Sequence, residues 1–395
     1  MSISTASVLL GRRAGPARGR RFARGTRGGL GIEAGETWIR LSQLQRKGRQ
    51  DLWRTLSLQS RGERSASTGR HLLRTAGFRK QRVVCALNLP HLDVFPLTLE
   101  GCSGESLEGQ IVARAGEQLS YALTDAVLDY MVLSGGLRRP GCAGTTVLVF
   151  ACPRRLVDDL LARLDALDLA PARLITPACA LAASLGASEA KPRRLAICSG
   201  DEATSVAVIE QGTVLLERIL PWGLQRLAES LAAELSLPIE QSRELLVRPD
   251  RKTAEQIHEA GTAPDAAGDE EPVDAAGACA PEGRAREDRA QEDPLEAAMQ
   301  QILGPALQEL VQEASACLGY CDSFLQPVPA ADVTVLGAVA HLPALRLLLE
   351  QDLGLAVRIG LSGIATPPAA PCAPTHEIAG CCALWPGETH REANP

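Results

Sequence analysis

Two stretches of the chain share one pattern of apolar and polar positions. Residues 30–44 read LGIEAGETWIRLSQL, and residues 195–209 read LAICSGDEATSVAVI. In each stretch an apolar run enters a turn that holds a glycine and acidic residues, and a second apolar run leaves it. This pattern is typical of a β-hairpin, and such a turn presents backbone N–H groups that can bind a phosphate. The repeat predicts an internal duplication, with two α/β halves and a cleft between them.

The rest of the chain predicts further helices and strands. Apolar residues at helical spacing predict helices at 105–119, 154–169, 225–237, 239–247, 294–324 and 376–386. Short apolar runs predict strands on both sides of Pro90 within 82–98, and at 126–133, 145–153, 172–177, 213–221 and 355–361. Residues 331–353 predict a strand, a turn of small residues and a helix. Residues 45–81 are basic and polar, and they predict no clear element.

Composition divides the 395 residues into structured and unstructured parts. Residues 1–29 are rich in arginine and contain no acid, and residues 249–293 are acidic with almost no large apolar side chain. Both compositions predict disorder. The expected organisation is a basic arm over 1–29, a first half over 30–186, a second half over 187–386 interrupted by the insertion 249–293, and a tail over 387–395.

The same composition excludes several classes of protein. Aromatic residues make up only 3% of the chain, which argues against modules that stack nucleic-acid bases, and we expect no nucleic-acid partner. No apolar run reaches the length of about 18–20 residues that spans a bilayer, so a membrane role would be peripheral.

The 12 cysteines mostly stand singly in apolar runs, which indicates buried thiols in a reducing cytoplasm. Two local groupings invite a metal-site interpretation. One is Cys317 with Cys321, and the other is Cys372, His376, Cys381 and Cys382. Neither grouping repeats a CxxC knuckle, and we expect no metal site.

Three consecutive segments carry a family resemblance. GIEAGETWIRLSQL is followed by RVVCALNLPHLDVFPLTL and then by ESLEGQIVARAGEQLSYALTDAVLDY. This order is similar to the PilM family of actin-like proteins in type IV pilus assembly, and to its FtsA-like relatives. The segment LVFACPRRLVDDLLARLDALDLAPARLITPACAL resembles the one that links the domains of that family. The resemblance covers residues 29–247 and 294–386.

The resemblance implies a fold, a partner and a location. The fold would be α/β, with duplicated actin/Hsp70-like (ribonuclease H-like) halves and a small inserted α+β subdomain at about 82–133. The protein would be a cytoplasmic scaffold, peripheral to the inner membrane. It would bind the cytoplasmic tail of a PilN-like inner-membrane protein in a groove beside the subdomain. A homo-oligomer is also possible.

The resemblance also implies where ATP and Mg²⁺ would bind. Glu33 and Cys198 stand at the two positions where the family has aspartates that hold magnesium. A third, glycine-rich turn before a helix would accept the nucleoside, and here it reads LGAVAH with Gly337. The candidate nucleotide-binding residues are Glu33, Gly35, Glu36, Thr37, Arg40, Cys198, Gly200, Asp201, Glu202, Thr204 and Gly337.

Each of the three motifs departs from the pattern of an active site. Cys198 is neutral and soft, and is therefore a poor magnesium ligand, although Asp201 lies close enough in the chain to substitute. Glu33 is one methylene longer than aspartate. The third turn has one glycine where the family has two or three, and each extra Cβ crowds a ligand.

These departures predict that the ATP site is weakened or lost. The protein would then be a pseudo-ATPase with no catalytic residues. They favour a protein that binds no cofactor over one that binds ATP and Mg²⁺. Two alternatives stay open. One is an active actin-like Mg-ATPase in pilus or division-complex assembly, and the other is an assembly-platform component of type II secretion.

Overall fold

The computed structural model describes residues 29–47, 50–59, 66–79, 83–100, 105–133, 144–185, 192–247, 294–325, 327–360 and 377–384. Apart from Gly29, the predicted basic arm over 1–29 lies outside these residues. So do the insertion 249–293, the tail 387–395, and two members of one cysteine grouping, Cys372 and His376.

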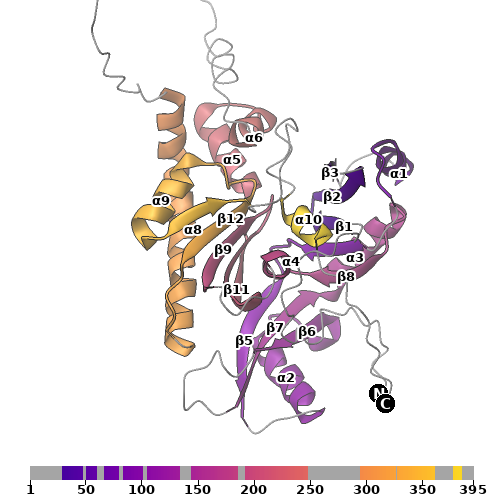
Figure 1. The fold of residues 1–395 in the computed structure, drawn as a ribbon, viewed down its shortest axis with the longest axis vertical. Helices are drawn as coiled ribbons and strands as arrows, with labels where there is room; N and C mark the ends of the chain where they lie inside the picture. Colours follow the sequence, from indigo (N-terminus) through magenta and orange to yellow (C-terminus); the bar gives the residue numbers. More distant parts are fainter. Residues whose placement is uncertain are drawn as a thin grey trace, which may run out of the picture.

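The first half is built on a five-stranded sheet with the order β3-β2-β1-β4-β8 (Figure 1). Its strands are β1 (Leu30–Ala34), β2 (Trp38–Lys47), β3 (Gln50–Gln59), β4 (Val83–Leu87) and β8 (Pro171–Ile175). Strands β1, β2 and β3 pair antiparallel, whereas β4 and β8 continue the sheet in parallel. The register places Arg40 of β2 opposite Glu33 of β1.

The second half repeats this plan with the order β11-β10-β9-β12-β13. Its strands are β9 (Arg194–Ser199), β10 (Thr204–Glu210), β11 (Thr213–Leu220), β12 (Asp332–Gly337) and β13 (Ala356–Ile359). Again three antiparallel strands are followed by two parallel ones. The matching topology confirms the internal duplication that the two hairpin sequences predict.

A small antiparallel sheet forms the inserted subdomain. Its order is β5-β7-β6, from β5 (Asp93–Leu99), β6 (Ala126–Val132) and β7 (Thr145–Pro153), with the 3₁₀ turn η1 (Leu123–Asp125) before β6. Helix α2 (Glu105–Gln118) packs on one face through Ile111 and Ala115. The small sheet therefore spans residues 93–153, a later range than the predicted 82–133. The difference arises because β4 joins the first half's sheet and the strongly apolar β7 takes the central place.

Helices cover the sheets of both halves (Figure 1). They are α1 (Ala66–Thr75), α3 (Arg154–Ala166), α4 (Pro177–Leu185), α5 (Leu224–Leu235), α6 (Ile239–Val247), α8 (Pro294–Phe324), α9 (Pro343–Leu353) and α10 (Glu377–Ala383). Cys317 and Cys321 lie on the buried face of α8, within the core of the second half. Their spacing therefore reflects one packed helix face. Strand β3 and helix α1 occupy the stretch 45–81, where the sequence predicts no element.

The short helix α10 lies between the two large sheets (Figure 1). All seven of its residues are buried. Its Ile378, Cys381 and Cys382 pack in one apolar cluster with Ala86 of the first half and Leu336 of the second. Helix α10 thus joins both halves into one core.

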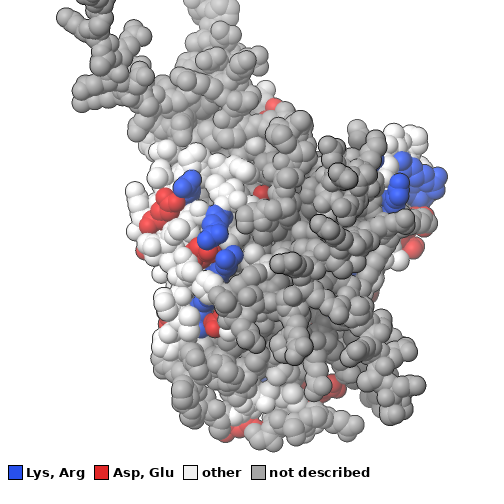
Figure 2. Space-filling view, in the orientation of Figure 1, with Lys and Arg blue, Asp and Glu red and all other residues white. Residues whose placement is uncertain are grey.

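Charges of both signs are interspersed over the face that carries α8 and α9, whereas basic side chains gather at α1 (Figure 2). The surface pairs include Arg346 with Glu350 and Arg226 with Glu309, each 3.0 Å apart. Exposed pairs of this kind stabilise a fold by about 0–1 kcal/mol, so the buried contacts decide the architecture. Within the described ranges, no helix has both the length and the apolar character that crossing a membrane requires.

Candidate functional site

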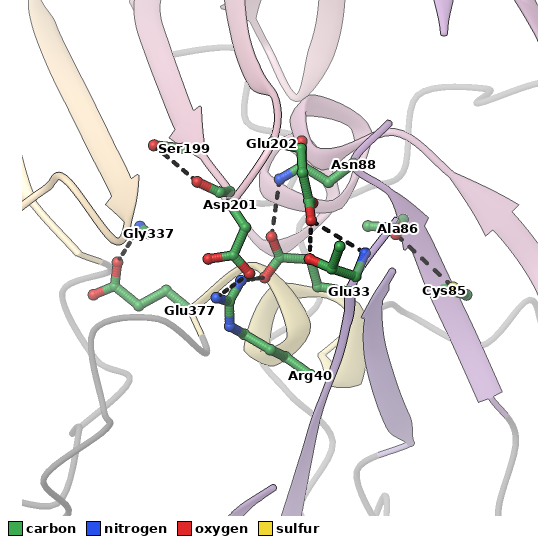
Figure 3. Close-up of polar contacts among 12 residues, drawn as sticks. Glu33, Arg40, Cys85, Ala86, Asn88, Ser199, Asp201, Glu202, Gly337 and Glu377 are labelled. Carbon is green, nitrogen blue, oxygen red and sulfur yellow. Dashed lines mark hydrogen bonds and ion pairs between the residues drawn. The ribbon is translucent and has the colours of Figure 1, made fainter. Parts of the chain in front are cut away.

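The turn between β1 and β2 meets the turn between β9 and β10 (Figure 3). The backbone N–H of Thr37 donates a hydrogen bond of 3.1 Å to Oε1 of Glu202, and the Thr37 hydroxyl donates to the same oxygen. Gly35 leaves room for this carboxylate, because a Cβ at that position would lie 2.5 Å from Glu202 Oε2. The first turn therefore binds a carboxylate that the second turn supplies.

A buried group of charged side chains lies beside these turns (Figure 3). Arg40 Nη2 donates to Asp201 Oδ2 at 2.5 Å, and Arg40 Nη1 is 3.6 Å from Glu33 Oε2. Arg243 of α6 also approaches Asp201, with its Nη1 3.7 Å from Oδ1. The residues Glu33 and Asp201 are only 2% and 3% exposed. Since a buried charge is costly unless it is paired, these contacts depend on one another.

Asn88, which follows β4, links the two halves at the same place. Its Nδ2 donates to Glu33 Oε1 at 2.9 Å. The amide packs against Gly200, where a Cβ would lie 2.0 Å from Asn88 Nδ2. The second turn therefore needs glycine at this position, because any side chain would clash with the Asn88 amide.

Burial changes the acidity of this group. Desolvation raises the pKa of Glu33 from 4.5 to about 7, against the opposing influence of Arg40 and of the hydrogen bond from Asn88. For Arg40, burial acts to lower the pKa, but the carboxylates of Asp201 and Glu33 outweigh it, so the pKa is raised. Arg40 therefore stays charged, and its main partner is Asp201.

The third turn also binds a carboxylate of the chain. The backbone N–H of Gly337 donates to Glu377 Oε2 at 2.9 Å. Gly337 has a left-handed φ of +91°, and a Cβ there would lie 1.9 Å from the Ser199 carbonyl oxygen, so only glycine fits. Desolvation raises the pKa of Glu377 to about 7, although the Gly337 bond opposes it.

Three of the predicted residues have other surroundings than this group of contacts. Cys198 points into the apolar core between the halves, where burial raises the pKa of its thiol well above the usual value. Thr204 begins β10 and is fully buried. The Glu36 carboxylate lies 3.8 Å from His91 Nε2. Among the residues that the structure describes, no three potential metal ligands are grouped as a metal ion would need.

The sequence motifs thus locate much of the site but miss three members. The structure brings together Glu33, Gly35, Thr37, Arg40, Gly200, Asp201 and Glu202, and it places Gly337 in a separate contact with Glu377. The missed residues are Asn88, Arg243 and Glu377. Asn88 had a local signal, a polar side chain directly after a buried strand. The contacts of Arg243 and Glu377 exist only in the folded chain.

A magnesium nucleotide that bound at the turns as the resemblance implies would have to displace these internal contacts. It would compete with Glu202 for the Thr37 N–H and with Glu377 for the Gly337 N–H. It would also have to separate Asp201 from Arg40 before that carboxylate could approach a cation. Cys198 stands at one of the two positions where the family resemblance implies a metal-holding aspartate, and burial raises the pKa of its thiol, so that it stays neutral.

Comparison with known proteins identifies the fold. No family model matches the chain, and no curated protein matches it. Among solved structures, the chain is similar to one described as the "PilM-PilN type IV pilus biogenesis complex", with a TM-score of 0.63 and 18% identity over 90% of this chain and 98% of that one. This similarity confirms the duplicated actin-like fold with its inserted subdomain.

Two further structures are similar at lower scores. The ethanolamine utilization protein EutJ of Carboxydothermus hydrogenoformans has a TM-score of 0.46 and 13% identity, over 94% of this chain and 92% of that one. The cytoplasmic domain of EpsL, an inner-membrane component of the type II secretion system of Vibrio cholerae, has a TM-score of 0.34 and 15% identity, over 53% of this chain and 76% of that one.

Proposed function

We propose that this protein is a scaffold of type IV pilus assembly, or of a related secretion system. It binds the cytoplasmic tail of a PilN-like inner-membrane protein, and so attaches peripherally to the membrane from the cytoplasm. The observation that carries the proposal is the extent of the structural similarity. It includes both halves and the small subdomain, and it covers almost the whole of the chain compared.

We place the tail at the β6 edge of the small sheet. Strand β6 is the last strand in the order β5-β7-β6, and within the described residues it pairs only with β7. Arg154 Nη2 donates to the Ala126 carbonyl at 2.8 Å and so fixes the start of this edge. The other end carries Val132, which is 50% exposed. An extended peptide can add to such an edge through backbone hydrogen bonds and can cover the exposed valine.

A binding assay with partner tails tests both parts of this proposal. The probes are fluorescent peptides of the polar N-terminal tails of single-span membrane proteins encoded beside this chain's gene, titrated with the full chain. We expect one tail to bind equally well with and without Mg-ATP. We expect Val132→Asp to weaken binding about tenfold or more, because the edge would then carry a charge that the peptide must bury.

The matched control is Leu347→Asp, which changes an equally exposed apolar side chain on α9 in the other half. This variant should bind the tail like the wild type. Failure of every neighbouring tail would contradict the scaffold function. Equal binding by Val132→Asp would leave the function standing but overturn the docking place.

We further propose that the cleft does not hydrolyse ATP. Asp201 is paired with two arginines, and the position of the second metal-holding aspartate is a neutral cysteine. An active Mg-ATPase in pilus or division-complex assembly is the second candidate, favoured by the retention of Gly35, Gly200 and Gly337 at the three turns. A titration with Mg-ATP distinguishes the two.

A further inference from the structure

We infer that Glu202 and Glu377 are intramolecular ligands that occupy two of the three turns and hold the two halves together. This inference deepens the proposal that the protein works without nucleotide. It does not depend on which tail the small subdomain binds.

Glu202 contributes the clearest contact. It comes from the second half, yet both of its hydrogen-bond donors, the N–H and the hydroxyl of Thr37, belong to the first half. A turn that aims an N–H and a hydroxyl at one point binds carboxylate and phosphate oxygens by the same chemistry. Gly35 supplies the space that the Glu202 carboxylate fills. The position that suits a phosphate from solution is therefore occupied by a group of the chain.

Two further contacts join the halves beside Glu202. Arg40 of the first half pairs with Asp201 of the second, and the Asn88 amide of the first half packs against Gly200. The pair of Arg40 and Asp201 is buried on both sides, with side-chain exposures of 8% and 2%. Water does not screen such a pair as it screens a surface ion pair. Separating the two halves would leave the buried charges of Arg40 and Asp201 without partners. The contact between Glu202 and Thr37 is therefore made while the halves are held together.

Glu377 plays the corresponding part at the third turn. The Glu377 carboxylate accepts a hydrogen bond from the backbone N–H of Gly337, at the end of β12. Glu377 is also the first residue of the buried helix α10. The docking of α10 between the halves therefore also fills the turn where a nucleoside would bind. Carboxylates of the chain thus occupy two separate turns, one that suits a phosphate and one where a nucleoside would bind.

Hydrogen exchange at single amides tests this inference, with the full-length protein and Glu202→Ala. We expect the Thr37 amide to exchange about tenfold faster or more in the variant, because it loses a hydrogen bond to a charged acceptor. Added potassium acetate should restore protection of the Thr37 amide by supplying the missing carboxylate. Potassium chloride at the same ionic strength should not restore it.

Three controls make the result specific. Glu202→Gln keeps the side-chain length and an acceptor oxygen, and should give an intermediate exchange rate at Thr37. Glu234→Ala removes an exposed carboxylate from α5 and should change neither amide. Glu377→Gln should accelerate exchange of the Gly337 amide while leaving Thr37 protected, since the two contacts lie at different turns.

Two results would overturn the inference. One is wild-type exchange at Thr37 in Glu202→Ala. The other is faster exchange that acetate does not reverse and that extends through β4 and β8, which would show general loss of structure. Either outcome leaves the tail-binding proposal intact, and failure of tail binding leaves this inference intact.

Discussion

Replacing Arg40 with alanine is expected to lower the free energy of unfolding by about 3–5 kcal/mol. The substitution removes the main cationic partner of Asp201 and leaves the nearby carboxyl of Glu33 buried beside it. A buried charge that loses its partner costs far more than the pair contributes when intact. The measurement is the urea midpoint with an unchanged m-value.

Arg218→Ala is the matched control for this experiment. Arg218 also pairs with a carboxylate, that of Glu313 at 2.9 Å, but its side chain is 56% exposed. Loss of that pair should change the free energy of unfolding by about 0–1 kcal/mol. If the two arginine variants had equal stability, the buried pair would not hold the cleft together.

Replacing Gly31 with alanine is expected to displace helix α10. An added Cβ would lie 1.9 Å from the Ala379 carbonyl oxygen and 2.3 Å from the Ala383 N. Both are backbone atoms, so no side-chain rotation relieves the contact. Undocking α10 would expose apolar surface shared by both halves, and we expect a loss of more than about 4 kcal/mol. Thermal unfolding and alkylation of Cys381 and Cys382, followed by mass spectrometry, report the change.

Gly319→Ala provides the comparison. Gly319 lies within helix α8, and a Cβ there meets no atom within 4 Å. Alanine should therefore stabilise the protein by about 0.5–1 kcal/mol through its better helix propensity. Wild-type stability and protected thiols in Gly31→Ala would contradict the close packing of α10 against β1.

The sequence predicts the fold well where the signal is local. The two hairpins, the helix at α2 and the strands β4 to β7 follow from the spacing of apolar residues along short segments. The prediction fails at β3 and α1, where polar residues interrupt the pattern. It also misplaces the inserted subdomain, because the chain alone does not show that β4 pairs with β1 while β7 pairs with β5 and β6.

The candidate site shows the same division. Glu33 on β1 and Asp201 in the turn after β9 belong to two recognisable hairpins, so the sequence places them near each other. The sequence does not show that Arg40 bridges the two acids, or that Glu377 reaches Gly337. Cys198 is recognisable as a departure from the family pattern, but its burial in the core between the halves follows only from the folded structure.

Isothermal titration of the purified full-length protein with Mg-ATP is the most direct test of the claim that the chain's own side chains occupy the turns. We expect no saturable binding, and any residual affinity should be weaker than a Kd of about 1 mM. A thermal melt of the same sample with Mg-ATP should show no shift, since only a ligand that binds the native state raises Tm. A micromolar Kd, lost on Glu33→Ala or Gly200→Ala, would contradict the account.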